Sequence, residues 1–152
     1  MATNLKKLVK QTMDKTLYCS LATAEKGRVW VCPVAFAYDN QMDIYFISNL
    51  RSRHIKNIAR NNKVAVAIYT TDQKVKGHKA GVQLEGTATR VHGHSHIERA
   101  YYIYFRRLPE WDDADVSYFK AKKAEWPLFK INTAKLFYFN NKLFGETAKR
   151  VL

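Results

Sequence analysis

The sequence predicts an α+β fold built on an antiparallel sheet or barrel, with short helices inserted between mostly sequential strands. About six segments show the alternation and the β-branched and aromatic residues that are typical of strands. Three or four other segments carry apolar residues at helical spacing. The turns between strands are short, which favours closure of an antiparallel sheet over a layered βαβ sheet. No repeat, low-complexity stretch or linker interrupts the 152 residues, so we expect one domain over 1–152.

The N-terminal third is expected to form a helix and then an antiparallel meander. Apolar residues at helical spacing predict the helix, with Thr3 or Asn4 as its N-cap. Strands are expected at 16–24, 28–38 and 42–48, with short polar turns between them.

The middle of the chain is expected to form a helix and two more strands. Ser52 is a natural N-cap, and the helix must end near Asn61 because the following residues have the pattern of a strand. These strands are expected at 63–70 and 81–91, on either side of the lysine-rich loop 71–80.

Two residues restrict how their strands lie in the sheet. Proline cannot donate to a sheet ladder, so Pro33 requires its strand to lie at an edge, to carry a bulge or to face a ligand. Gly86 marks either a bulge or a close approach of two backbones.

The C-terminal part is expected to hold two helices and a last strand. Ser95 and Glu98 fit a capping box, which predicts a helix that starts at Ser95 and stops at Pro109. Two further elements are expected: a short helix capped by the acidic segment 110–115, and a strand over 128–139.

The charge of the chain points to anionic partners. It has 26 Lys and Arg against 13 Asp and Glu, a formal net charge of +13. A positive potential of this size attracts nucleic acid, membrane headgroups or phosphorylated small molecules. The excess is concentrated between Arg51 and Lys79, where Asp72 is the one acid. A solvated basic face is the alternative interpretation.

The sequence indicates a soluble cytoplasmic protein. No apolar run approaches the ~20 residues that span a bilayer, so no membrane partner is expected, and the first residues lack the pattern of a secretory signal. Cys19 and Cys32 match neither a CxxC nor a zinc-ligand pattern, so we expect free thiols in a reducing compartment. Both are expected to be small buried apolar residues.

The histidine-rich segment 92–96 is a candidate metal site. On a strand, His92 and His94 would point the same way, a spacing that can bind a transition metal. No Asp, Cys or further ligand lies nearby in the sequence to complete the set. We therefore favour a solvated turn and expect no metal.

The strongest local signal is the junction where a strand ends at Ser48 and a helix begins at Ser52. Unpaired N–H groups at a helix N-terminus bind anions, and arginine can clamp phosphate oxygens in bidentate fashion. The serine hydroxyls can donate as well. The junction therefore predicts a phosphate site, with a capped helix whose arginines face water as the alternative.

The stretch YFISNLRSRHIKNIARNNKVAVAIY resembles the phosphate-binding segment of the pyridoxamine 5′-phosphate oxidase-like flavoproteins. The segments VQLEGTATRV, FRRLP and NNKLFGETAK extend the similarity, which is to an uncharacterised bacterial branch of that superfamily. The resemblance implies a six-stranded antiparallel split β-barrel with short peripheral helices. It also implies a homodimer with FMN in the cleft between the subunits.

The resemblance also implies which residues hold the cofactor. Those around the FMN phosphate would be Ser48, Asn49, Arg51, Ser52, Arg53 and His54. The residues along the isoalloxazine would be Val31, Cys32, Pro33 and Val34. Gln83 lies near a position that contacts the ring system, although an outward-facing strand residue is an equal alternative.

The chain departs from the vitamin-B6 oxidases in ways that bear on its activity. His54 stands where they carry a lysine, and their C-terminal arginine-containing substrate motif is absent. Oxidation of pyridoxamine phosphate is therefore not expected.

Three functions remain open. The first is an FMN-dependent oxidoreductase of unknown substrate, without an identifiable acid or base. A non-catalytic flavin carrier or sensor is the second, and related folds bind FMN, deazaflavin or haem. The third, a nucleic-acid-binding protein, lacks any recognisable motif.

Overall fold

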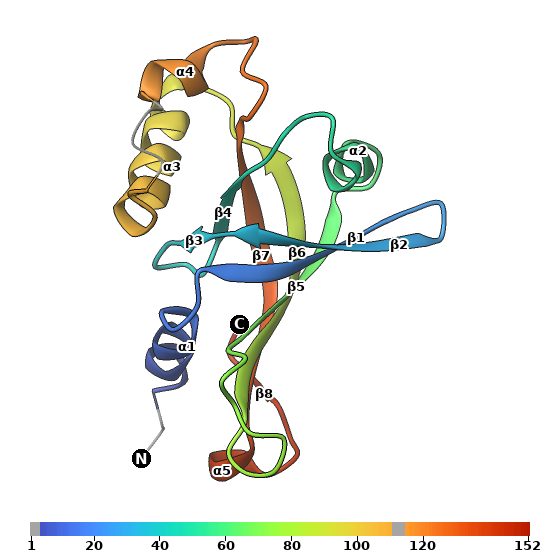
Figure 1. Cartoon of the computed structure of the whole chain (residues 1–152), viewed down its shortest axis with the longest axis vertical. Helices are drawn as coiled ribbons and strands as arrows, with labels where there is room; N and C mark the ends of the chain where they lie inside the picture. Colours follow the sequence, from blue (N-terminus) through green and yellow to red (C-terminus); the bar gives the residue numbers. More distant parts are fainter. Residues whose placement is uncertain (1–3, 111–114) are drawn as a thin grey trace.

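The computed structural model describes residues 4–110 and 115–152, which form one antiparallel sheet with short helices around it (Figure 1). The helices are α1 (Leu5–Met13), α2 (Arg53–Arg60), α3 (His94–Arg107), α4 (Val116–Lys120) and α5 (Asn141–Phe144). The strands are β1 (Tyr18–Glu25), β2 (Arg28–Ala35), β3 (Ala37–Tyr38), β4 (Ile44–Ile47), β5 (Lys63–Tyr69), β6 (Ala80–Arg90), β7 (Leu128–Asn140) and β8 (Lys149–Arg150). The predicted α+β fold class is confirmed.

The sheet is curled into a half-barrel. Its strands lie in the order β2-β1-β5-β6-β7-β4-β3, all neighbours are antiparallel, and β8 pairs with β7. Only Phe36 separates β2 from β3 along the chain, although these strands lie at opposite ends of the order. The sheet must therefore curl until its two ends meet near Phe36.

The eight strands among the described residues exceed the six that were expected, for two reasons. The predicted strand 28–38 is divided at Phe36, whose side chain is fully buried and whose N–H donates to Leu17 O. The C-terminal tail adds β8, a segment for which the sequence predicted no strand.

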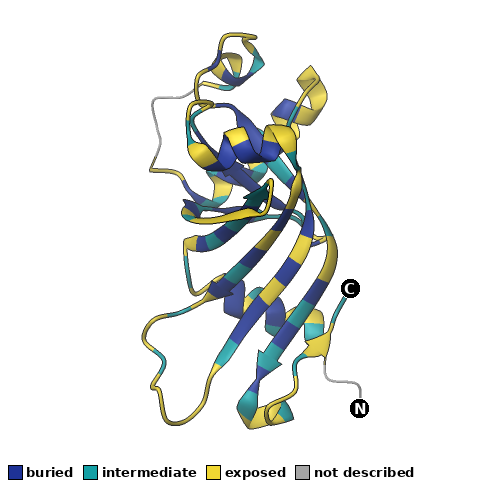
Figure 2. Cartoon of the chain, turned by 90° about the vertical axis from the view of Figure 1, so that its right-hand side faces the viewer, coloured by how far each residue is buried: buried dark blue, intermediate teal, exposed yellow. Residues whose placement is uncertain are grey.

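The main core fills the inside of the curl. Burial alternates along the strands, as the coloured ribbons of Figure 2 show, because successive side chains point to opposite faces. Phe46 stacks on Phe129 with ring centroids 5.3 Å apart. Helix α1 adds Val9 and Met13, both fully buried. Full burial of side chains of this size contributes roughly 1.5–3 kcal/mol each.

A second, smaller core lies on the other face of the sheet, under α3. Ile97, Ala100 and Tyr104 of this helix pack with Tyr45 of β4 and Leu128 of β7. Helix α3 therefore covers the outer face at one end of the sheet.

The expectations for Pro33 and Gly86 are both confirmed. Strand β2, which contains Pro33, is the edge of the sheet. The register shifts between Glu85 and Gly86, and a Cβ on Gly86 would lie 2.2 Å from Asn132 O. Gly86 thus marks a bulge and a close backbone approach at the same time.

The helix starts were predicted with mixed success. Asn4 caps α1, with its side chain accepting from Lys7 N at 3.1 Å; Thr3 lies outside the described residues. The Ser95 capping box is wrong, because the chain turns earlier at Gly93, where φ is 88°, and α3 begins at His94. Glu98 pairs with Lys120 instead.

The expected helix after the acidic segment is α4, and Asp115 holds its N-cap position without a side-chain capping bond. Residues 111–114 of the acidic segment lie outside the described part of the chain.

Arg107, in the FRRLP segment, joins α3 to the start of the chain. Its guanidinium donates to Met13 O at 2.7 Å, to Thr16 O at 2.5 Å and to Phe36 O. The same group lies 4.4 Å from the centre of the Phe36 ring. Because Arg107 donates hydrogen bonds to three main-chain carbonyls, it has a structural role.

Candidate functional site

The junction between β4 and α2 is held in place by backbone hydrogen bonds. Ser48 N donates to Pro127 O at 3.4 Å, and Leu50 N donates to Glu125 O at 3.0 Å. The side chain of Asn49 accepts from Arg51 N at 2.8 Å, which forms an Asx turn. The segment 48–52 is thus fixed to the connection before β7.

Three polar side chains meet at the start of α2. Ser48 Oγ lies 2.5 Å from His54 Nε2, and Ser52 Oγ lies 3.4 Å from the same nitrogen. The hydroxyl of Ser52 donates to Asn49 O at 2.6 Å. This Ser48–Ser52–His54 cluster brings together residues that the sequence had predicted to share a phosphate site.

Ser52 occupies the N-cap position as predicted, but its hydroxyl makes no capping bond to the helix. The first turn of α2 also contains no acidic side chain. Among the described residues, the N–H groups that this helix start leaves without an intrahelical partner therefore meet no side-chain acceptor. The positive end of the helix dipole is thus not balanced by an acidic side chain of the helix, and such an end favours anions.

His54 can donate or accept a hydrogen bond in this cluster, depending on its tautomer. Its side chain is buried, and burial lowers its pKa because the charged form loses its hydration. The fixed positive charge at the junction therefore comes from the arginines.

The two arginines of the junction point in different directions. Arg51 is exposed, with its guanidinium 3.8 Å from Glu125 Oε2. Arg53 reaches the other way and lies 4.2 Å above the centre of the Trp30 ring on β2. In this chain the two groups form no joint clamp, but Arg53 connects the cluster to the edge strand.

The predicted residues of β2 divide between the two faces of the sheet. Val31 and Pro33 are exposed on the outer face, whereas Val34 is buried and Cys32 is half-buried on the other. A strand at the edge of a sheet presents a row of N–H and C=O groups without a neighbouring strand. The backbone of β2 is thus open along one side.

Cys19 and Cys32 are both free thiols. Cys19 is buried as expected, and desolvation raises its pKa to about 12, so it is a poor nucleophile at neutral pH. Cys32 is half-buried, which is less than expected, and its thiol lies 3.4 Å from Pro33 O.

Gln83 does not meet the other predicted residues within one chain. The register places Pro33, Ser20, Ala67 and Gln83 in one row across β2, β1, β5 and β6. Three strand spacings separate Gln83 from Pro33, about 14 Å. Its side chain is exposed on the outer face of the sheet.

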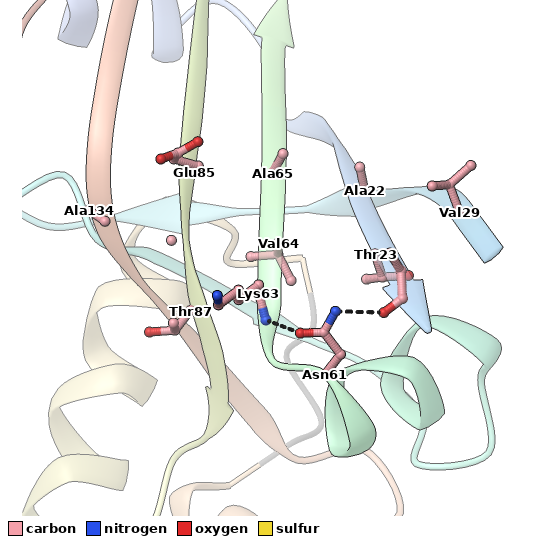
Figure 3. Close-up of a pocket in the computed structure, with 12 residues that line it drawn as sticks. Ala22, Thr23, Val29, Asn61, Lys63, Val64, Ala65, Glu85, Thr87 and Ala134 are labelled. Carbon is pink, nitrogen blue, oxygen red and sulfur yellow. Dashed lines mark hydrogen bonds between the residues drawn. The ribbon is translucent and has the colours of Figure 1, made fainter. Parts of the chain in front are cut away.

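A groove with a volume of about 500 Å³ crosses the outer face of the sheet (Figure 3). Small and aliphatic residues such as Ala22, Val29 and Ala65 line the groove, and Glu85 lies toward the side opposite Val29. None of the residues predicted to bind the cofactor lines it. Asn61 braces one end through Lys63 N and Ala24 O.

Sequence reasoning missed two residues that shape the junction. Trp30 supports Arg53, as described above. Asn57 is buried in α2 and donates to Thr23 Oγ1 at 3.0 Å, which fixes the helix to β1. The signal for Asn57 was a polar residue on the apolar face of the helix, between Ile55 and Ile58.

The histidine segment does not form the arrangement considered for a metal. β6 ends at Arg90 and α3 begins at His94, so His92 and His94 are not on one strand. Within residues 4–110 and 115–152, no group of three or more His, Cys, Asp or Glu side chains could hold a metal ion. The helices in those ranges are also too short or too polar to cross a bilayer.

The sequence model of the family described as Pyridoxamine 5'-phosphate oxidase matches residues 5–138. No curated protein matches the chain.

Solved structures share the fold at low identity. A heme binding protein from Mycobacterium smegmatis is 14% identical with a TM-score of 0.76; the match covers 99% of this chain and 59% of that one. This chain thus spans about three fifths of that protein.

Two further structures cover more of their own length. A putative 5-nitroimidazole antibiotic resistance protein from Bacteroides thetaiotaomicron is 16% identical with a TM-score of 0.71, over 91% of this chain and 84% of that one. A FAD-binding protein from Mesorhizobium loti is 18% identical with a TM-score of 0.64, over 91% and 94%.

Proposed function

Because the chain belongs to the pyridoxamine 5'-phosphate oxidase family, we propose that it binds FMN at the β4–α2 junction and acts as a flavin-dependent oxidoreductase. The observation that carries this proposal is the Ser48–Ser52–His54 cluster at an open helix N-terminus, linked by Arg53 to the edge strand β2. The FAD-binding and heme-binding proteins of similar fold support a cofactor of this size.

The donors at the junction fit a phosphate group. The N–H groups of the first turn of α2 and the hydroxyl of Ser48 can donate to phosphate oxygens, whereas the hydroxyl of Ser52 donates to Asn49 O. Arg51 can turn from Glu125 at little cost, since an exposed ion pair of this kind contributes about 0–1 kcal/mol. Arg53 rests on a ring that is itself 41% exposed, and a charge-assisted bond to phosphate is the stronger contact.

The edge strand β2 fits the ring system of the flavin. Its open backbone can hydrogen-bond the polar edge of a flat ligand, and Pro33 lacks the N–H that would otherwise need a partner. When bound, the flavin supplies hydride acceptance, and the protein supplies binding, orientation and exclusion of side reactions.

We further propose that two copies of the chain form the complete site, with the cofactor between them. The outer face of the sheet carries large apolar side chains in water: Tyr18, Val29 and Val31 are 61%, 79% and 60% exposed. Patches of this kind mark interaction surfaces. Gln83 lies on the same face, too far from β2 of its own chain, so a second copy would bring its cofactor to Gln83.

The test is titration of the purified protein with FMN and with riboflavin, followed by absorbance and flavin fluorescence. Arg53→Ala is expected to weaken FMN by about 10- to 100-fold, because a charge-assisted contact contributes about 1.5–3 kcal/mol. Riboflavin, which lacks the phosphate, should bind both proteins alike.

The matched control is Arg60→Ala, at the other end of α2, where the guanidinium pairs with Glu25 at 3.2 Å. This variant should bind FMN as the parent does. Equal weakening of FMN and riboflavin by Arg53→Ala would contradict the phosphate role.

A non-catalytic flavin carrier is the second candidate, and the scarcity of acid–base groups at the junction favours it. His54 is held by Ser48, and Glu125 faces Arg51. Anaerobic mixing of the FMN-loaded protein with NADH or NADPH separates the two functions. Bleaching of the flavin absorbance supports the oxidoreductase, and a flavin that no reductant reduces supports the carrier.

A further inference from the structure

Ser48 has one hydroxyl proton, which it can donate either to His54 Nε2 or to a bound phosphate. Its Oγ lies 2.5 Å from His54 Nε2, and both side chains are buried. Ser52 cannot replace it as the donor to this nitrogen, because the Ser52 proton already goes to Asn49 O at 2.6 Å. In the protein without a ligand, either Ser48 donates to Nε2 or a protonated Nε2 donates to Ser48.

A phosphate at the junction removes this choice. Phosphate oxygens accept hydrogen bonds, so the Ser48 hydroxyl must turn its proton toward the ligand to contact it. Its oxygen then faces His54 Nε2 with lone pairs only, and a bare nitrogen there would be repelled. The Ser48–His54 contact survives only when Nε2 carries a proton, either in the neutral Nε2–H tautomer or in the imidazolium, and a phosphate dianion on the far side of Ser48 favours the imidazolium.

We propose that His54 takes up a proton when the phosphate group of the cofactor binds, so that binding at this site is coupled to protonation. This inference rests on the proposed function. The phosphate dianion accepts the bond from Ser48, the imidazole nitrogen of His54 gains a proton from solvent, and the imidazolium balances part of the added negative charge. No covalent bond forms or breaks apart from the transfer of this proton.

The surroundings of His54 hold few other groups that could respond. The charged and titratable groups on its own segment and on the packed elements are Arg51, Arg53, Glu125, Cys32, Arg90, Arg60 and Glu25. Arg51 faces Glu125, Arg60 pairs with Glu25, and Arg53 lies on Trp30. The charge that binding brings close to His54 is therefore that of the phosphate group.

The direction of the pH dependence follows. Burial keeps the pKa of His54 below its usual range in the free protein, and a bound dianion raises it. Affinity for FMN should rise as the pH falls through the window between these two values and level off below it. The phosphate itself gains a proton near pH 6, which acts in the opposite sense, so the contribution of His54 must be isolated by a variant.

Isothermal titration calorimetry of FMN binding, in two buffers with different ionisation enthalpies, counts the protons taken up. The parent protein should take up a fraction of a proton, up to one, in the window where His54 changes state. His54→Asn keeps a polar side chain without a titration and should take up none. His54→Lys carries a permanent charge and should also show none. Riboflavin should give no uptake in any of them.

The ratio of FMN affinities, parent to His54→Asn, should increase as the pH falls from 8, by up to about tenfold for each unit of pKa difference between the free and the bound protein. A ratio that stays constant, with equal proton counts, overturns the inference and leaves the FMN site standing. Failure of the parent protein to bind FMN overturns the proposed function and this inference with it.

A measurement on the parent protein covers variants that fail to fold. With ¹⁵N-labelled histidine, both ring nitrogens of His54 should give the resonances of protonated nitrogens in the FMN-saturated protein, because a neutral ring leaves one of them bare. A bare nitrogen in the saturated complex overturns the inference.

Discussion

The corner around Arg107 and the junction around Arg53 each place a guanidinium group over an aromatic ring. They differ in which groups accept hydrogen bonds from that guanidinium. Arg107 is half-buried and donates to three main-chain carbonyls. Arg53 is exposed, and among the described residues it meets the Trp30 ring and no hydrogen-bond acceptor. The comparison teaches that occupied donors make an arginine structural, whereas free donors beside an open helix N-terminus leave it available to a ligand.

The largest expected effect is on the structural side of this comparison. Arg107→Ala removes the donors to Met13 O, Thr16 O and Phe36 O in a partly buried corner, and Met13 O keeps only the long bond from Thr16 N at 3.4 Å. We expect the free energy of unfolding to fall by about 3 kcal/mol, since an unsatisfied buried acceptor costs about 1–3 kcal/mol. Urea denaturation followed by circular dichroism measures this change.

Two controls accompany this variant. Arg106→Ala changes the exposed neighbour and should alter the free energy of unfolding by less than about 0.5 kcal/mol. Arg107→Lys keeps the charge but lacks the planar fork, so it should recover only part of the loss. Similar midpoints for Arg106→Ala and Arg107→Ala would refute the structural role.

A smaller effect concerns the pH dependence of stability at the junction. The folded chain holds His54 with a lowered pKa, while the unfolded chain binds a proton near pH 6.5. The unfolded state therefore binds more protons below that pH, and stability falls as the pH decreases through it. His54→Asn should show a shallower fall, by at most about 1.4 kcal/mol per pH unit.

The comparison for this prediction is His96→Asn, because His96 is exposed at the start of α3. Denaturation midpoints of both variants and the parent, measured from pH 8 to pH 5, separate burial of His54 from the general effect of charge. A His54→Asn curve parallel to that of the parent would show that burial of this histidine has no thermodynamic consequence.

The smallest effect is that of the Arg53–Trp30 contact. A double-mutant cycle with Arg53→Ala and Trp30→Leu should give a coupling of about 0.5–1 kcal/mol in the free energy of unfolding, as for an exposed cation–π pair. A coupling above about 2 kcal/mol would place Arg53 with Arg107 among the structural arginines.

Much of the fold could be predicted because its signals are local. The missing N–H of Pro33 limited its strand to an edge, a bulge or a ligand-facing position, and the structure shows the edge. The missing side chain of Gly86 pointed to a bulge or a close backbone approach, and the structure shows both. The division of the strand 28–38 at Phe36 could not be predicted, since the group that binds Phe36 O is Arg107, 71 residues further along. The start of α3 was misplaced because the turn at Gly93 outweighed the Ser95 pattern.

In the candidate site, too, contacts between residues close in sequence could be predicted, and contacts between strands could not. Short spacing at a helix start brought Ser48, Ser52 and His54 together, as expected. The position of Gln83 depends on the register of three strand pairs, and the contact of Arg53 with Trp30 depends on which face of β2 each residue occupies. A shift of one residue reverses such a facing, so a single sequence could not fix either.

The one-residue link between β2 and β3 joins the first and last positions of the strand order. Because the chain joins the two edges of the sheet at Phe36, these edges cannot move apart at that point. The connection at Phe36 therefore holds the two edges together, since Phe36 N donates to Leu17 O and Phe36 O accepts from Arg107. An insertion next to Phe36 should therefore open the curl, whereas one in the loop 70–80 lengthens a connection between the neighbouring strands β5 and β6.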